Sequence, residues 1–182
     1  MDRIETKNLV LRKAKESDLD AIYRNIWSDS SVAETMMWKP TESYEEAVDR
    51  LKRTLLYQSQ YPAFFVCLKE TDEPIGFAGM REEEPGVYEE TGICVAVKCQ
   101  NRGFGKEILG ALLELAFVHY EGDRFIYAFM QHNIRSKNVC LRHGFQYLGK
   151  GIEVREWDQK EHTCEYYYLD KDEYLKRRNS EQ

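Results

Sequence analysis

The 182-residue chain lacks the features that mark several classes of protein. It has no internal repeat, no low-complexity tract and no linker rich in proline or glycine. Its first residues, MDRIETKNLVLRKAKESD, contain no long apolar run, so we expect neither a signal peptide nor a membrane span. This length suffices for one substantial core, and we therefore expect a single domain over residues 1–182.

The spacing of the cysteines and the net charge argue against further classes of protein. The five cysteines are scattered and contain no Cys-x-x-Cys pair, so no disulfide framework or zinc knuckle is expected. The four histidines are too dispersed to indicate a metal site. A net charge of −6 argues against a nucleic-acid partner. We expect a reduced, cytoplasmic protein without a membrane partner; the aromatic run EYYYL leaves monomer and homodimer open.

Hydrophobic periodicity and turn residues predict a mixed α/β fold with a partly antiparallel sheet. Ser17 with Asp20, and Ser43 with Glu46, have the spacing of helix-capping pairs. A short polar helix or tail is expected after Asp170. The predicted strands cover residues 8–14, 63–68, 74–80, 124–130, 145–157 and 163–169, with a further β-rich run within 83–99. The predicted helices cover residues 17–27, a segment that starts at 43, a segment from the glycines to about 119, and residues 136–144.

The stretch VAVKCQNRGFGKEILGALLEL, residues 95–115, changes from strand to helix at two glycines. Helix N-termini carry unpaired N–H groups that attract phosphate, and glycines let a phosphate approach the backbone closely. Arg102 and Lys106 add cationic donors, so residues 100–106 suit a pyrophosphate. The spacing is neither a Walker loop nor a complete G-x-G-x-x-G motif. A tight turn with solvated charges is the alternative that the glycines alone leave open.

A second motif favours the binding alternative. The run NIRSKNVCLRHGF begins at Asn133 after a predicted strand and ends at Gly144–Phe145. Together with Gln100-x-x-Gly103-x-Gly105 it resembles the GCN5-related N-acetyltransferase (GNAT) superfamily, over nearly the whole chain. The two-helix entry with MMWKP and the late EYYYLDKDEY resemble the branch that includes ribosomal-protein N-terminal acetyltransferases.

The resemblance implies a twisted, mostly antiparallel sheet of about seven strands flanked by about four helices. It also implies acetyl-CoA as co-substrate, with the glycine loop at the pyrophosphate and the Asn133 helix beside the pantetheine. Arg142 is a further candidate for the 3′-phosphate, although a solvated helix face is the favoured explanation for it. The cofactor contacts that it implies are Val95, Val97, Gln100, Arg102, Gly103, Phe104, Gly105, Lys106, Asn133 and Ser136.

The implied reaction is direct transfer of an acetyl group to an amine in a ternary complex. It needs a base for the amine proton, N–H donors for the oxyanion and an acid for the thiolate. Glu90 is the candidate base, with Glu89 in reserve; many relatives carry the carboxylate where this chain has Gly92. Cys140 stands where many relatives have the tyrosine that acts as the acid.

The sequence leaves several candidates for the acid that protonates the thiolate and for the residues of the acceptor pocket. Cys140 is as well explained by packing, and Ser136, a water, Tyr167 or Tyr168 are the alternatives as the acid. Trp38, with Met36 and Met37, and His132 are candidates for the acceptor pocket, beside Glu90. The acceptor is a peptide N-terminus, a polyamine or a drug-like amine. A catalytically weak acyl-CoA-binding sensor or scaffold is the alternative function.

Overall fold

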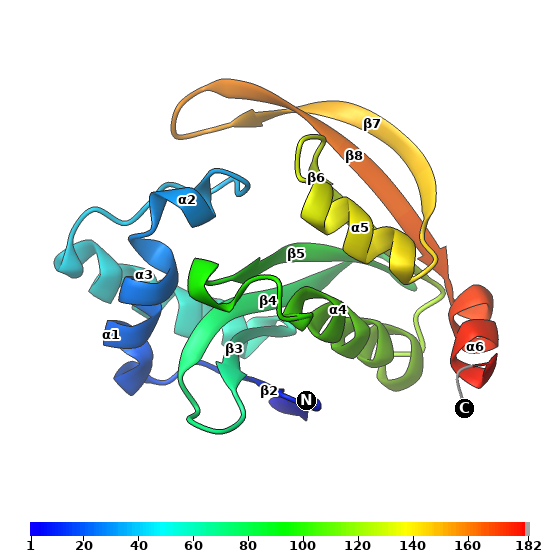
Figure 1. Ribbon diagram of the computed structural model, residues 1–182, viewed down its shortest axis with the longest axis horizontal. Helices are drawn as coiled ribbons and strands as arrows, with labels where there is room; N and C mark the ends of the chain where they lie inside the picture. Colours follow the sequence, from blue (N-terminus) through cyan, green and yellow to red (C-terminus); the bar gives the residue numbers. More distant parts are fainter. Residues whose placement is uncertain (181–182) are drawn as a thin grey trace.

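The computed structural model describes residues 1–180, which form a single eight-stranded sheet with helices on both faces (Figure 1). The strand order is β1-β2-β3-β4-β5-β6-β8-β7, and the one parallel pair is β5 with β6. The predicted mixed, mostly antiparallel α/β class is confirmed, with an eighth strand, β1, that the sequence did not indicate. The strands are β1 (Arg3–Glu5), β2 (Leu9–Arg12), β3 (Ala63–Leu68), β4 (Pro74–Glu84), β5 (Val87–Val95), β6 (Arg124–Met130), β7 (Gln146–Arg155) and β8 (Lys160–Asp170).

Six α-helices occur among the described residues, where about four were expected. They are α1 (Leu19–Ile22), α2 (Ser30–Ala33), α3 (Tyr44–Gln60), α4 (Phe104–Glu114), α5 (Ile134–Arg142) and α6 (Lys171–Ser180). Short π-helical turns extend α1 over Tyr23–Trp27 (η2) and α4 over Leu115–His119 (η4), and 3-10 turns cover Glu16–Asp18 (η1) and Val97–Cys99 (η3). None of these helices is long and apolar enough to cross a membrane.

The structure confirms the predicted helix start at Ser43 and contradicts the one at Ser17. Ser43 caps α3 as predicted, because its hydroxyl accepts the Glu46 N–H at 3.1 Å. The prediction for Ser17 is wrong: the helical segment begins at Glu16, and the Asp18 carboxylate accepts the Lys15 N–H at 2.7 Å. Asp18 is held there because it is also the buried partner of the Arg12 guanidinium.

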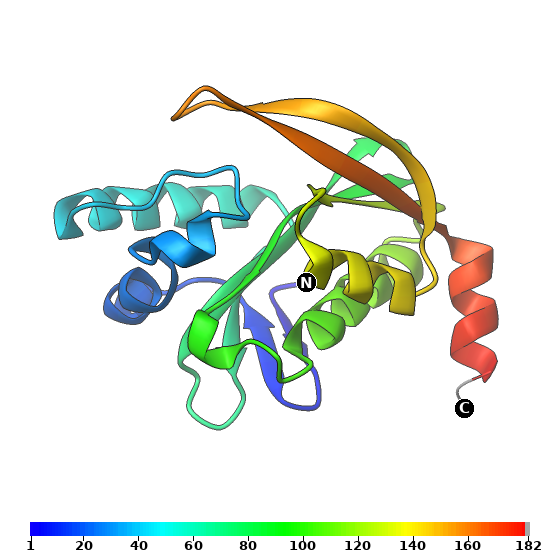
Figure 2. The same cartoon turned by 45° about the horizontal axis from the view of Figure 1, so that its top comes forward.

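The core lies on both faces of the central strands. Helices α1 to α3 cover one face, and α4 and α5 lie side by side on the other (Figure 2). On the first face Trp27 packs against Phe65 of β3, with ring centroids 6.0 Å apart. On the second face, Ile108 and Leu112 of α4 are fully buried, as their helical spacing predicts.

The two central strands separate where the functional motifs converge. β5 pairs with β6 over three residues, Val87–Glu89 against Arg124–Ile126. Beyond that point β6 continues in register with β8 to Met130, and β5 continues with β4 to Val95. A cleft lies between the C-terminal halves of β5 and β6, whose residues line the same cavity. The β7–β8 hairpin arches beside these strands (Figure 1).

Candidate active site

A β-bulge in β5 shapes one wall of the cleft. Ala78 pairs with Ile93 and Met80 pairs with Glu90, so two residues of β5, Thr91 and Gly92, lie opposite the single residue Gly79. Gly92 has φ +122°, a torsion at which an L side chain is strained, and a Cβ there would lie 3.1 Å from the Phe77 ring. The bulge therefore explains why this chain has no carboxylate at position 92.

Glu90 brings a carboxylate to the same place from two residues away. Its Oε2 accepts the backbone N–H of Gly92 at 2.5 Å. The carboxylate thus lies against the bulge, which was the uncertain part of the sequence prediction. The Gly92 N–H is engaged by this contact, so in this conformation it does not serve as an oxyanion donor.

The cleft suits Glu90 to accept a proton near neutral pH. Burial raises the pKa of Glu90 to about 8, the N–H donated by Gly92 opposes that rise, and the neighbouring Glu89 adds to it. Burial raises the pKa of the half-buried Glu89 as well, with Glu83 contributing. Two carboxylates next to each other in a desolvated cleft are disfavoured in their doubly ionised form.

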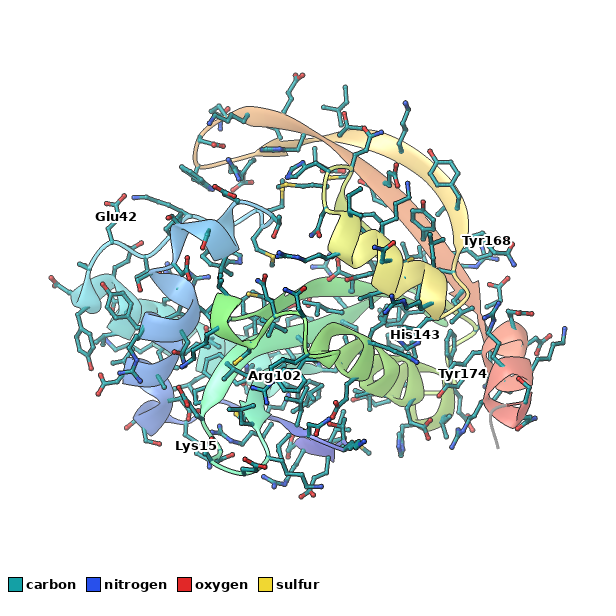
Figure 3. All side chains as sticks on the ribbon, viewed as in Figure 1. Lys15, Glu42, Arg102, His143, Tyr168 and Tyr174 are labelled. Atoms are coloured by element: carbon teal, nitrogen blue, oxygen red, sulfur yellow. The ribbon has the colours of Figure 1, made fainter. Side chains whose placement is uncertain are left out.

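The glycine loop connects the end of β5 to α4. Asn101 has φ +61° and Gly103 has φ +83°, and Gly103 is the residue that precedes the first turn of α4. A Cβ on Gly103 would meet no atom within 4 Å, so its torsion requires the glycine while its surface stays open. Arg102, labelled in Figure 3, is exposed and lies 4.8 Å from the Phe104 ring at this helix start. Phe104 itself is a core residue.

Gln100 is fixed between the strand end and α5. Its Nε2 donates to the Val95 carbonyl at 3.2 Å, and its Oε1 accepts from Arg135 Nη1. Arg135 was not singled out from the sequence, because its proximity to the loop depends on how α5 docks. Val97 departs from the prediction: β5 ends at Val95 and Val97 is exposed in η3, so it offers no strand-like backbone edge.

The start of α5 lies against the cleft. Asn133 Oδ1 accepts the Ser136 N–H at 3.1 Å, so Asn133 caps the helix. Ser136 also interacts with the Tyr127 hydroxyl, while burial, as the larger effect, raises the pKa of that phenol. Tyr127 comes from the part of β6 that no longer pairs with β5. Sequence reasoning missed Tyr127 because an alternating aromatic in a strand is indistinguishable from core.

Two cavities meet in the cleft. The first, about 500 Å³, extends along the glycine loop to α5 and is lined by Val95, Gln100, Gly103, Lys106, Arg135 and Arg142 among others. The second, about 390 Å³, lies against Glu89, Glu90, Trp38 and the β8 residues Cys164 and Tyr166. Both are lined by Thr35, Met36, Ile93, Tyr127, Asn133 and Ser136.

Several of the predicted candidates line neither cavity: the cofactor candidates Val97 and Arg102, the acid candidates Cys140, Tyr167 and Tyr168, and His132. Cys140 is fully buried and lines neither of them, and burial raises the pKa of its thiol to about 12. His132 is exposed in the turn before α5 and also lines neither. Tyr167 donates its hydroxyl to Glu165 at 3.1 Å instead of facing the cleft. The geometry thus favours a packing role for Cys140.

The comparisons with known proteins agree with this geometry. Residues 8–146 match the family described as the Acetyltransferase (GNAT) domain. The chain belongs to the GNAT acetyltransferase family. The comparison with curated proteins found no match.

Solved structures confirm the GNAT fold. A GNAT-family acetyltransferase from Bacillus anthracis is 20% identical, with a TM-score of 0.80, covering 93% of this chain and 99% of that one. A candidate ribosomal-protein-serine acetyltransferase from Vibrio cholerae is 20% identical, with a TM-score of 0.77 and the same coverage. A spermidine N-acetyltransferase from Vibrio cholerae, solved with CoA and spermine, is 19% identical, with a TM-score of 0.75, covering 92% of this chain and 98% of that one.

The first cavity fits a coenzyme A thioester. Its entrance has the open backbone of Gly103 and the side chains of Lys106, Arg135 and Arg142, which suit phosphate groups. Its inner end reaches the unpaired edge of β5, where backbone groups are free to bond an extended amide chain. Within residues 1–180, no cluster of three or more histidine, cysteine or acidic side chains is placed to hold a metal ion.

The two loop glycines are expected to respond oppositely to alanine. Gly103→Ala should lower the free energy of unfolding by about 1 kcal/mol, because alanine resists a positive φ. Gly105→Ala should be neutral or stabilising by up to about 1 kcal/mol, since a Cβ would lie an ordinary 3.5 Å from Val139 and alanine favours helix. Urea denaturation of both variants measures this; equal destabilisation would show that torsion at Gly103 is not the constraint.

Stability should depend on pH through Glu90. Its pKa is near 4.5 when unfolded and about 8 when folded, so the native state binds the extra proton between these values. This contribution is fully present below pH 4.5 and is lost as the pH rises through 8. Glu90→Gln has no titrating carboxyl at this position, so its stability does not fall over this pH range for that reason. The Tm of Glu90→Gln minus the Tm of wild type should therefore increase by at least about 2 °C between pH 5 and pH 8.5, since about 1 kcal/mol corresponds to 2–4 °C for a protein of this size. Scanning calorimetry with Glu83→Gln as an exposed control tests this; a pH-independent difference would contradict it.

Proposed function

We propose that this protein transfers an acetyl group from acetyl-CoA directly to an amine that enters the second cavity. One observation carries the proposal: a cavity beside the glycine loop and a cavity beside Glu90 meet at a wall that contains Tyr127, Asn133 and Ser136. Two reactants bound in this way approach each other without a covalent enzyme intermediate. When bound, acetyl-CoA supplies an activated acyl group and a thiolate leaving group.

Glu90 is the proposed general base. A catalytic base works best when its pKa lies near the working pH, and the pKa of Glu90 is raised to about 8. The Glu90 carboxylate is held by the Gly92 N–H at 2.5 Å and also interacts with the backbone N–H of Ala128 on β6, so it is positioned between the two strands. Glu89, Glu90 and Glu153 all line the second cavity, and a cationic amine that enters it would favour the ionised form of Glu90, which a base requires.

Tyr127 is the proposed source of the proton for the departing thiolate. It lies in the wall common to both cavities, and Ser136 hydrogen-bonds its hydroxyl. Burial keeps the phenol protonated near neutral pH, as a general acid must be. Cys140 lacks access to either cavity, so we assign it to packing.

The acceptor belongs to the class of primary amines. A structural neighbour carries spermine and another is named for a ribosomal protein, so a polyamine and a protein N-terminus are both acceptors to test. The site residues, the acetyl-CoA dependence and a cytoplasmic location are parts of this proposal. A non-catalytic acyl-CoA-binding module remains the alternative, favoured by Cys140 in place of the family's tyrosine.

Turnover should depend on Glu90 and on pH. We expect kcat/KM for acetyl-CoA-dependent acetylation to rise about tenfold per pH unit below pH 8 and then to level off. Glu90→Gln should lower it about 100-fold or more and remove this pH dependence. The measurement is acceptor-dependent CoA release with a thiol reagent, using Glu89→Gln as the adjacent control. Tight acetyl-CoA binding with no release for any peptide, polyamine or aminoglycoside would favour the binding module instead.

Two variants distinguish Tyr127 from Cys140 as the acid that protonates the thiolate. Tyr127→Phe should lower kcat about tenfold with little change in CoA affinity, because a CoA thiolate leaves moderately well unaided. Cys140→Ala should leave kcat within about twofold and lower the free energy of unfolding by about 1 kcal/mol through a small cavity. Single-turnover kinetics and urea denaturation of both variants give these values. The reverse pattern, with kcat lost in Cys140→Ala alone, would return the acid role to the cysteine.

A further inference from the structure

A third cavity, of about 190 Å³, lies between α3 and the strands β3 and β4. It is lined mainly by aromatic and small residues, including Trp27, Trp38, Phe77 and Tyr57. The single charged side chain in its wall is Arg50 of α3. At roughly 30 Å³ for each water molecule, this volume holds a group of side-chain size and excludes a nucleotide.

Arg50 lacks an acidic partner. Among residues 1–180, no carboxylate oxygen lies within 4.0 Å of its guanidinium, whereas Arg12, Arg124 and Arg155 each have one. Its Nη1 donates to Thr41 Oγ1 at 2.9 Å and to the Lys39 carbonyl at 3.4 Å. A guanidinium has five N–H donors, so most of its hydrogen-bonding capacity is left for a ligand.

The surroundings hold this cation in place without neutralising it. The guanidinium carbon lies 4.4 Å from the Trp38 ring centroid and 4.9 Å from that of Trp27. Burial lowers the pKa of Arg50 to about 10, so the group stays charged at neutral pH while losing hydration. A desolvated guanidinium without a carboxylate partner, in the wall of a cavity, favours an anion there.

The third cavity is adjacent to the acceptor cavity, because Trp38 and Thr91 line both. Glu89, Glu90 and Glu153 lie in the wall of the acceptor cavity and suit an amine, whereas Arg50 lies in the wall of the third cavity. The two cavities thus have opposite charge preferences.

We propose that the acceptor is a zwitterion whose amine lies at Glu90 and whose carboxylate binds Arg50. This inference rests on the proposed function and narrows its acceptor class to amines that also carry an acid. A guanidinium binds a carboxylate through two parallel N–H···O bonds, which gives both strength and orientation. The carboxylate belongs either to an acidic side chain near a peptide N-terminus or to a free amino acid. A polyamine, which has no anionic group, leaves Arg50 unpaired and is disfavoured.

Matched acceptors test the proposal. The pairs are short C-terminally amidated peptides with aspartate or asparagine, and glutamate or glutamine, at the second position, together with the free amino acids glycine and alanine and their α-amides. We expect wild type to favour the acid over its amide about 10- to 100-fold in kcat/KM, the size of a charged hydrogen bond. Arg50→Gln should abolish this preference, Arg50→Lys should retain part of it, and Arg53→Gln, an exposed arginine on the same helix, should leave it unchanged.

A binding readout keeps this test separate from that of turnover. Tryptophan fluorescence of the CoA-saturated protein is titrated with the same acceptors, since two indole rings flank Arg50. Acid-selective binding that depends on Arg50 without any acetylation would support the subsite and overturn the proposed function. Equal acetylation of acids and amides, unchanged in Arg50→Gln, would support the function and overturn the subsite. Urea denaturation and CoA affinity of Arg50→Gln confirm that the variant is folded, so a selective loss cannot be attributed to unfolding.

Discussion

The short parallel pairing between β5 and β6 is the constraint on which the site depends. Three residue pairs hold the strands together, and β6 then follows β8 while β5 follows β4. Unpaired backbone groups inside a protein are costly, so where Glu90–Val95 and Tyr127–Met130 no longer pair with each other, side chains, water or a ligand must bond their backbone groups. The Glu90 carboxylate accepts the Gly92 N–H, and Gln100 donates to the Val95 carbonyl. The bulge at Gly92 bends β5 and brings the Glu90 carboxylate to the cleft. The candidate cofactor edge, the proposed base and the proposed acid thus arise from one irregularity of the sheet.

Desolvation shifts the pKa values of an acid in the cleft and of a base in the third cavity in opposite directions. It raises the pKa of Glu90 and prepares the carboxylate to take a proton, and it leaves Arg50 charged but poorly solvated. Elsewhere the buried charges are paired, as Arg12 is with Asp18, and such pairs mainly hold elements together. Ionisable groups without an opposite charge in the wall of a cavity are the ones that a charged ligand stabilises, and here Glu90 and Arg50 lie in the walls of adjacent cavities.

Local sequence signals predicted the parts of the site that local structure determines. Ser43 caps a helix and Gly103 has the positive φ of a tight turn, because capping and torsion depend on neighbouring residues. The contacts of Tyr127, Arg135 and Arg50 could not be predicted, since each depends on strands and helices far apart in the chain. The prediction at Ser17 is wrong because the helix start is determined by Asp18, which pairs with Arg12, and Arg12 is itself held by Asp72 from a distant part of the chain. The assignment of Cys140 followed the family position, whereas its burial follows from how α5 docks on the sheet.

The loop from α2 to α3 lines both of the cavities to which we assign a substrate. Thr35 and Met36 line the cofactor and acceptor cavities, and Trp38, two residues further on, separates the acceptor cavity from the one at Arg50. This loop is supported from the β7–β8 hairpin, where Arg155 pairs with Asp158 and its Nη1 lies 3.5 Å from the Met36 carbonyl. Because the same short segment contacts all three spaces, a shift that admits a larger acceptor also changes the wall beside the thioester. Under the proposed function, acceptor selection and acetyl transfer would therefore be coupled through the position of this loop, and the Trp38 ring beside Arg50 would be the part of it that an acceptor meets directly.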